Sequence, residues 1–152
     1  MSILPREIHL ETVMGKLSYL YGRNIIKYLK ENIDKVRLRF TSTGRVRDLL
    51  IEDKLYFTLR MNDGYLLPTI NSAQHIETYV TVSDDSVPFV SSGRSVIAKS
   101  IINVSGEPYP GEEISVKDRS GKVLAVGRLL LSPDEIRSVK RGIAVKVRDH
   151  VK

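Results

Sequence analysis

Short segments of apolar and polar residues, separated by tight-turn signals, recur along this chain and constrain its fold more than any other feature. In the first half, residues typical of turns cluster at 41–45, 52–54 and 61–64, and segments rich in Leu, Val and Phe lie between and after them. Strands joined by tight turns form an antiparallel meander, and the Asn-Asp-Gly of the last cluster supplies positive-φ positions for a hairpin. The first half is therefore predicted to contain a small antiparallel sheet.

Other signals frame this sheet. Apolar residues recur at helical spacing within residues 22–31 and predict an amphipathic helix, with Gly22 marking its start or a bend. The period changes to two over residues 35–40, which is typical of a half-buried strand. Pro68 suits an edge strand or a strand end. Residues 71–76 are predicted to form one helical turn, capped by the first or second of them.

In the second half, the order of strand, turn and helix predicted within residues 87–101 matters for function. Residues 87–90 are typical of a short buried strand, 91–93 of a turn, and the apolar spacing over 96–101 of a helix with Ser91 or Ser92 as its N-cap. A helix that starts there would expose backbone N–H groups, which favour an anion such as phosphate. The same junction would also serve as an ordinary capped helix start.

The remaining signals complete the second half. Residues 113–118 alternate in polarity, a hairpin turn follows, and 122–131 form a nearly unbroken apolar strand in which Gly127 indicates a bulge or a close backbone approach. Ser-Pro-Asp-Glu at 132–135 is a capping box that predicts a short helix, and 143–148 alternate as a last strand. This order of elements favours a small barrel-like sheet with a helix at its side.

Composition excludes several classes of site. The chain has 152 residues, enough for one ordinary domain or two small ones, and it has no cysteine, so disulfides, Cys-type zinc sites and thiol nucleophiles are excluded. The histidines, His9, His75 and His150, stand far apart, so we expect no metal and no cofactor. No apolar run approaches the ~20 residues of a membrane span, and the N-terminus does not resemble a signal peptide. We expect a cytoplasmic protein.

The charge favours a polyanionic partner. The net charge is +6 and the isoelectric point is about 9.6. Residues 1–74 contain 12 basic and 8 acidic residues, a net charge of +4. The whole chain has 24 basic and 18 acidic residues, so the remaining residues contain 12 basic and 10 acidic ones, a net charge of +2. Because the excess is spread over both halves, we expect folded surfaces to meet the partner. A lysine- and arginine-rich surface of a thermostable protein would have the same charge balance.

Motifs for catalysis are lacking, whereas cations lie close to backbone-exposing glycines. No nucleophile motif, phosphate-binding glycine loop or His-Glu pair is present, so no catalytic residue is predicted. Arg94 and Lys99 follow the glycine turn, and Lys146 and Arg148 share the outward face of the last strand, opposite the side of Ile143 and its alternate neighbours. These four cations would line one groove if that strand lies beside the predicted helix. A solvated charged face is the alternative.

Four motifs of the second half occur together: the Ser-Gly-Arg-Ser-Val loop that begins at Ser92, Pro-Gly before the second strand, the Gly-x-Val-Leu-Ala-Val-Gly arm and the Gly-x-Ala-Val last strand. Through these motifs, residues 84–151 resemble a PUA domain, the module named after pseudouridine synthases and archaeosine transglycosylases. The first half is similar to the domain that precedes PUA in archaeosine transglycosylase and in small stand-alone archaeal relatives, through Thr-Gly-Arg-x-Arg at 43–47, Thr-x-Arg at 58–60 and Asp-Gly at 63–64. It departs from that pattern at Ser72-Ala73, which replaces a Gly-Ala pair, and at Tyr-Leu-Tyr-Gly-Arg (19–23), which stands where the relatives usually carry an aromatic-Gly-Lys segment.

The resemblance implies the fold and the partner. We expect an α+β chain, with an N-terminal α/β meander domain over residues 1–76 and a PUA mixed β-barrel over 77–152. The family implies binding of structured RNA, tRNA or rRNA, in RNA modification or ribosome assembly. Carried over position by position, the RNA-binding residues would be Ser92, Gly93, Arg94, Ser95 and Lys99, to which Lys146 and Arg148 add charge; Arg45, Arg47 and Arg60 would form a secondary contact.

Two other functions stay open at this point. The chain would act as a protein-interaction or targeting subunit of a separate RNA-modifying enzyme or ribosome-assembly protein if its sheet edges dock on that partner. A small hydrolase that uses Asp63 of the Asn-Asp-Gly turn is the third alternative. No membrane partner is expected.

Overall fold

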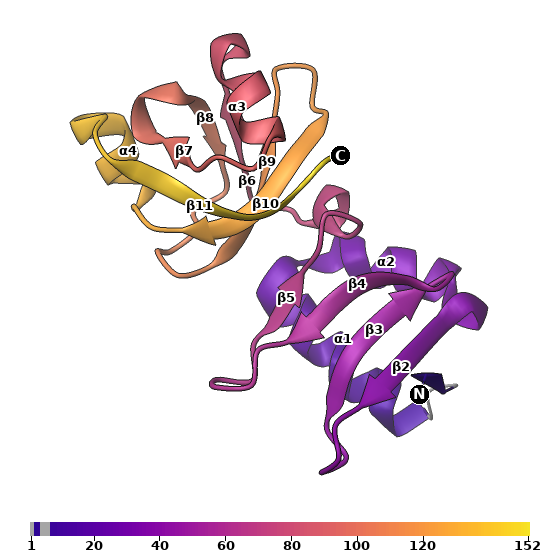
Figure 1. Cartoon of the computed structure of the whole chain (residues 1–152). Helices are drawn as coiled ribbons and strands as arrows, with labels where there is room; N and C mark the ends of the chain where they lie inside the picture. Colours follow the sequence, from indigo (N-terminus) through magenta and orange to yellow (C-terminus); the bar gives the residue numbers. More distant parts are fainter. Residues whose placement is uncertain (1, 4–6) are drawn as a thin grey trace. The chain divides into compact units, whose positions relative to one another are not determined.

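The computed structural model describes residues 2–3 and 7–152, and the chain divides into two compact units, residues 1–75 and 76–152 (Figure 1). Each unit has its own sheet and its own buried core. The fold is α+β, as predicted: helices and an antiparallel sheet in the first unit, and a mixed half-barrel sheet in the second.

The first unit is a five-stranded antiparallel sheet in the order β1-β2-β3-β4-β5, so the predicted meander is confirmed. Two helices lie on one face of this sheet (Figure 1). Pro68 ends the edge strand β5, where its missing N–H costs no ladder hydrogen bond. The elements are β1 (Ser2–Ile3), α1 (Glu7–Tyr21), α2 (Arg23–Glu31), η1 (Ile33–Lys35), β2 (Val36–Phe40), β3 (Val46–Ile51), β4 (Lys54–Leu59), β5 (Leu66–Pro68) and η2 (Ala73–His75).

The core of the first unit lies between the helices and the sheet. Leu17 and Ile25 of the two helices are fully buried, as is Phe57 of β4. The Tyr21 ring stacks on Phe57 with centroids 5.5 Å apart, and its hydroxyl donates a hydrogen bond to the Leu66 carbonyl. Each of these large apolar side chains contributes about 1.5–3 kcal/mol of burial. This packing holds both helices against the sheet.

Local details of the first unit depart from the sequence expectations. Helix α1 was not predicted, whereas α2 was, and Gly22 separates them with φ of 91°. In the Asn-Asp-Gly turn only Gly64 has positive φ, and the two-residue turn with positive φ is Glu52-Asp53, between β3 and β4. The predicted turn over 71–76 forms, but Ser72 Oγ donates to carbonyls of β4 and of the preceding turn instead of capping it.

The second unit is a six-stranded sheet in the order β7-β11-β10-β9-β6-β8, in which only β6 and β9 are parallel. The strand β7 and the longer β8 are its two edges. The elements are β6 (Tyr79–Val82), η3 (Asp84–Ser86), α3 (Val87–Ser91), β7 (Val96–Ile97), η4 (Ala98–Ser100), β8 (Ile101–Ser105), β9 (Glu113–Lys117), β10 (Val123–Leu129), α4 (Pro133–Val139) and β11 (Ile143–His150).

The order of helix and strand around Gly93 is the reverse of the prediction. Residues 87–91 form the helix α3, and residues 96–97 form the strand β7, followed by a single 3-10 turn. Gly93 therefore follows the C-terminus of a helix and does not precede an N-terminus. The prediction was wrong because short apolar runs suit a buried strand and a short helix equally well.

Three local predictions in the second unit are confirmed. At Ser132 the hydroxyl accepts from the Glu135 N–H (3.2 Å), and the Glu135 carboxylate accepts from the Ser132 N–H (3.1 Å), which completes the capping box of α4. The register of β10 and β11 shifts at Gly127. A Cβ on Gly127 would lie 2.2 Å from the Lys146 carbonyl oxygen, so only glycine allows the two backbones to come this close.

One face assignment on β11 needs correction. Ile143 is 48% exposed, whereas the adjacent Ala144 and Val145 are both fully buried. The register between β11 and β7 shifts between Ile143 and Val145, and this irregularity breaks the alternation on which the prediction rested. Beyond it, Lys146 and Arg148 do share the face opposite to Val145.

No helix among residues 2–3 and 7–152 is long and apolar enough to cross a membrane. Within the same residues, no three His, Asp or Glu side chains gather in a group that would hold a metal ion.

Candidate functional site

A groove of about 470 Å³ lies beside the loop that joins α3 to β7. It brings together three residues of the predicted site, Arg94 and Ser95 of the loop and Lys99 of the following turn. Arg94 and Lys99 are exposed. The carboxylate of Asp85 lines the same groove, so the local balance is two cations and one anion. The groove is therefore a basic surface depression that the loop and the turn build together.

The Gly93 loop closes α3 with a Schellman motif. The Arg94 N–H donates to the Phe89 carbonyl (3.0 Å), the Gly93 N–H donates to the Val90 carbonyl (3.0 Å), and Gly93 has φ of +99°. The Ser92 hydroxyl donates to the Phe89 carbonyl as well (2.8 Å). These N–H groups are already bonded inside the protein, so the free donors expected from a helix N-terminus at this point are not formed. In this loop the Arg94 side chain supplies the charge.

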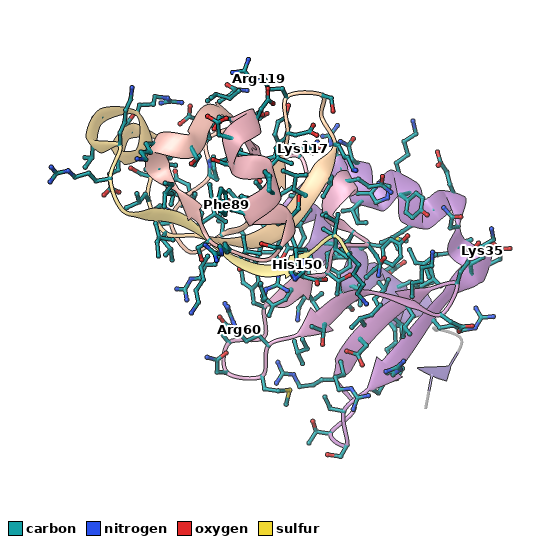
Figure 2. The ribbon with its side chains drawn as sticks, turned by 45° about the horizontal axis from the view of Figure 1, so that its top comes forward. Lys35, Arg60, Phe89, Lys117, Arg119 and His150 are labelled. Atoms are coloured by element: carbon teal, nitrogen blue, oxygen red, sulfur yellow. The ribbon has the colours of Figure 1, made fainter. Side chains whose placement is uncertain are left out.

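Phe89 is a groove residue that the sequence expectations placed in a buried strand. Phe89, labelled in Figure 2, is 53% exposed. The Arg94 guanidinium carbon lies 5.6 Å from the centre of its ring. The contact joins the C3 and C″ positions of the Schellman motif, where a side-chain contact is usual. Pro88 near the start of a helix and Gly93 just past its end are the signal that would have identified α3 in the sequence.

The last strand lies beside the groove, because β11 pairs with β7 through Val145 and Val96. The condition that the last strand lies beside a helix here is not met, because its neighbour is the strand β7. Lys146 is exposed on β11. The lining of the groove includes neither Lys146 nor Arg148. Any ligand that touches all four predicted cations must therefore extend beyond the groove along β11.

Arg148 is committed to a structural ion pair. Its Nε donates to the Glu113 carboxylate at 2.9 Å, and its Nη2 reaches the same oxygen. The Glu113 side chain is only 2% exposed, whereas that of Arg148 is 31% exposed. Since Arg148 is on β11 and Glu113 on β9, the pair ties these strands together across β10. Its guanidinium therefore neutralises a buried carboxylate of the protein itself.

His150 lies against the Gly93 loop. A Cβ added to Gly93 would meet the His150 ring at 2.9 Å. The His150 Nδ1 lies 2.7 Å from the carbonyl of Val151. A side chain at Gly93 would therefore suffer both a positive φ and a contact with this ring.

The three arginines predicted as a secondary contact belong to the first unit, and two of them are paired with acids. Arg47 Nε donates to the buried Asp48 carboxylate at 3.0 Å, and Arg60 Nε donates to Asp63 at 2.9 Å. The third, Arg45, lines a cavity of about 200 Å³ together with Lys16. Arg45 therefore lies in a cavity that a second cation, Lys16, also lines.

The pKa of Asp63 is too low for the general base that the hydrolase alternative requires. Its carboxylate accepts from the Arg60 guanidinium and from the Tyr65 N–H (3.1 Å), and these hydrogen bonds lower the pKa of Asp63 to about 2. A general base works best with a pKa near the operating pH. The Arg60 guanidinium carbon also lies 5.1 Å from the Tyr65 ring centre. Asp63 is therefore held as a turn-stabilising anion.

Comparison with protein families matches each unit to a different model. Residues 78–151 match the PUA domain, and residues 11–81 match the patch-forming domain C2 of tRNA-guanine transglycosylase.

Curated relatives carry both units in larger proteins. The tRNA-guanine(15) transglycosylase of Methanococcus maripaludis (strain C7) is 34% identical over 148 residues, which cover 91% of this chain and 22% of that protein. The tRNA-guanine(15) transglycosylase of Methanocaldococcus jannaschii is also 34% identical, and the match covers 90% of this chain and 22% of that protein. The chain thus spans about a fifth of the length of these relatives.

Solved structures share the fold over the whole chain. A conserved PUA domain protein from Thermoplasma acidophilum has a TM-score of 0.76 at 19% identity, with coverage of 99% of this chain and 93% of that one. A hypothetical protein from Pyrococcus horikoshii has a TM-score of 0.73 at 22% identity, with coverage of 99% and 94%.

Proposed function

Since this chain is a PUA-domain protein whose first unit is a C2 patch-forming domain, we propose that it binds structured RNA, tRNA or rRNA, and catalyses no reaction itself. The PUA family is an RNA-binding family, related here to the C-terminal part of tRNA-guanine transglycosylase. The role of such binding would be to grip the RNA for a modification enzyme or during ribosome assembly.

One observation carries the proposal: the groove that holds Arg94, Ser95 and Lys99 beside an exposed aromatic ring. Exposed cations attract the phosphate backbone and release its condensed counterions. An exposed Phe89 with the Arg94 guanidinium over it provides a flat surface on which an unpaired base can stack. Charge and stacking surface together are typical of a site for nucleic acid.

Binding would proceed in two stages. The net charge of +6 attracts the RNA over a distance, in a manner that salt screens. Arg94 and Lys99 then contact phosphates and the Ser95 hydroxyl adds a hydrogen bond, which fixes the position of the RNA but reads little of its sequence. Lys146, and the part of Arg148 that remains exposed, would extend the contact along β11, and Arg45 would contribute from the first unit.

Substitution of the groove cations tests the proposal. Arg94→Ala should weaken binding to many RNA sequences alike and reduce the salt slope of the binding constant by about one, because one phosphate contact is lost. Lys99→Ala should have the same effect in milder form. The measurement is fluorescence anisotropy with total tRNA and rRNA fragments over a range of salt concentrations. Gly93→Val is a less direct test, because it disrupts the cap of α3.

The matched control is Lys122→Ala. Lys122 is an exposed cation in the hairpin turn between β9 and β10, so its removal changes the net charge equally. We expect its binding curve to match that of the wild type. Full affinity and an unchanged salt slope in folded Arg94→Ala and Lys99→Ala variants would exclude this groove and make Arg45 the next candidate. Crosslinking in the native cell, followed by sequencing of the bound RNA, would identify the RNA.

A further inference from the structure

The edge strand β8 differs from the other sheet edges of this protein. Natural proteins protect edges by making them short or by placing proline or charge on them. Edge strands β1 and β7 have two residues each, and β5 has three and ends in Pro68. Strand β8 has five residues, Ile-Ile-Asn-Val-Ser, without charge or proline. Within residues 76–152, all of which are described, β8 pairs with β6 alone.

A bulge shapes this edge but does not remove it. The register between β6 and β8 shifts at Ile102, which is 48% exposed, while Ile101 and Val104 pack against the core. Beyond the bulge, Asn103–Ser105 keep a regular antiparallel register with β6. A strand alternates its backbone groups between its two sides, so those of Asn103–Ser105 that face away from β6 stay available for a further strand.

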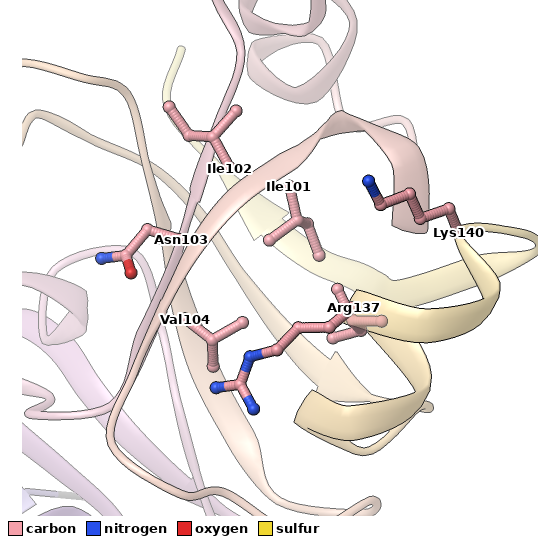
Figure 3. Close-up of a pocket in the computed structure, with 7 residues that line it drawn as sticks. Ile101, Ile102, Asn103, Val104, Arg137 and Lys140 are labelled. Atoms are coloured by element: carbon pink, nitrogen blue, oxygen red, sulfur yellow. The ribbon is translucent and has the colours of Figure 1, made fainter.

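A groove of about 330 Å³ runs along β8 and is closed on its other side by α4 (Figure 3). Its floor is apolar, formed by Ile101, Val104 and the buried Ile136. Arg137 and Lys140 of the α4 side complete the rim, and Figure 3 shows Arg137 reaching towards β8. No acidic residue is among the seven that line the groove. Arg137 pairs with Asp134 at 3.3 Å, but both side chains are exposed, so this pair is weak and exchangeable.

From these observations we propose that the β8 groove binds an extended, acidic segment of a partner protein by strand addition to β8. The unpaired edge supplies backbone hydrogen bonds, the apolar floor takes alternate side chains, and Arg137 and Lys140 select carboxylates. A second copy of the chain fits less well, because its own β8 carries no acid and its Arg137 and Lys140 would repel their counterparts. The surface lies on residues different from those of the proposed RNA groove.

A designed peptide tests this proposal. The probe is a fluorescein-labelled heptapeptide, Thr-Val-Glu-Val-Glu-Val-Thr, and the comparison peptide has lysine in place of both glutamates. We expect the full-length chain to bind the acidic peptide and not the basic one. The double variant Arg137→Gln/Lys140→Gln should bind the acidic peptide about fivefold more weakly, the size expected when two exposed ion pairs are lost.

The control and a second measurement separate strand addition from nonspecific attraction. Arg119→Gln/Lys122→Gln removes the same charge from an exposed hairpin turn of the same unit and should leave the affinity unchanged. Amide hydrogen exchange of Asn103–Ser105 should slow when the acidic peptide is bound. Equal binding of both peptides, equal losses in the two double variants, or unchanged exchange at these amides would overturn the proposal. So would a homodimer that protects the same amides without peptide.

Discussion

Replacing Arg148 by alanine leaves the buried Glu113 carboxylate without its cation, and we expect the second unit to lose about 3 kcal/mol of stability. Removal of one partner of a buried ion pair costs about 3–5 kcal/mol, because the remaining charge is desolvated and unpaired. Since the Arg148 side chain is 31% exposed, water can approach the carboxylate once the guanidinium is gone, which favours the lower end of that range. For a domain of 60–100 residues, this loss lowers the thermal midpoint by about 12–24 °C.

Urea unfolding followed by circular dichroism measures the effect. A double-mutant cycle with Glu113→Gln isolates the pair, because the double variant removes the buried charge together with its partner. We expect the double variant to recover much of the loss, with a coupling energy of about 2 kcal/mol. A loss below about 1 kcal/mol in Arg148→Ala, or additive losses in the cycle, would refute the reasoning that this guanidinium mainly neutralises Glu113.

The result also decides how β11 is tested for RNA binding. Weaker RNA binding by Arg148→Ala would reflect altered strand packing as much as a lost contact. Lys146 is exposed on the same face, so Lys146→Ala should change stability by less than about 0.5 kcal/mol and report on binding alone.

Three further outcomes are expected. Gly127→Ala should destabilise the second unit by about 2–3 kcal/mol, since its Cβ would lie 2.2 Å from the Lys146 carbonyl oxygen; a urea midpoint equal to that of the wild type would contradict this. Arg60→Ala should raise the pKa of Asp63 from about 2 towards 3.8, as read from an NMR titration of the carboxyl carbon. Because the folded pKa is the lower one, this interaction stabilises the fold above about pH 4 and fades as the pH falls towards 2; an unshifted titration would speak against the Arg60 contact. Burial lowers the pKa of His75 below its ordinary 6.5. Because the unfolded chain then binds this proton more readily than the folded one, the free energy of unfolding decreases as the pH falls below 6.5. His75→Phe should flatten the stability profile in this pH range.

Much of this fold follows from the sequence alone, because the relevant forces act between near neighbours. The capping box of α4 joins residues three positions apart, and the meander turns are set by adjacent residues. Gly127 was predicted as a place of close backbone approach for a local reason too, because a glycine inside an apolar strand often marks a bulge or such an approach. The cations Arg94 and Lys99 were likewise recognisable as neighbours of a glycine turn.

Other features were decided only by tertiary packing. Residues 87–101 contain two short apolar runs, and either run suits a helix or a strand; contacts with β10 and β11 made the first a helix and the second a strand. That choice placed Gly93 in the C-terminal cap of a helix instead of at a helix N-terminus, and it left Phe89 exposed. Arg148 finds Glu113 thirty-five positions away, at a distance that no local pattern reports. Local sequence sets the conformations that are available to a segment, but the free energy of burying one face against distant strands selects among them, and that selection determined which cations remain exposed for a partner.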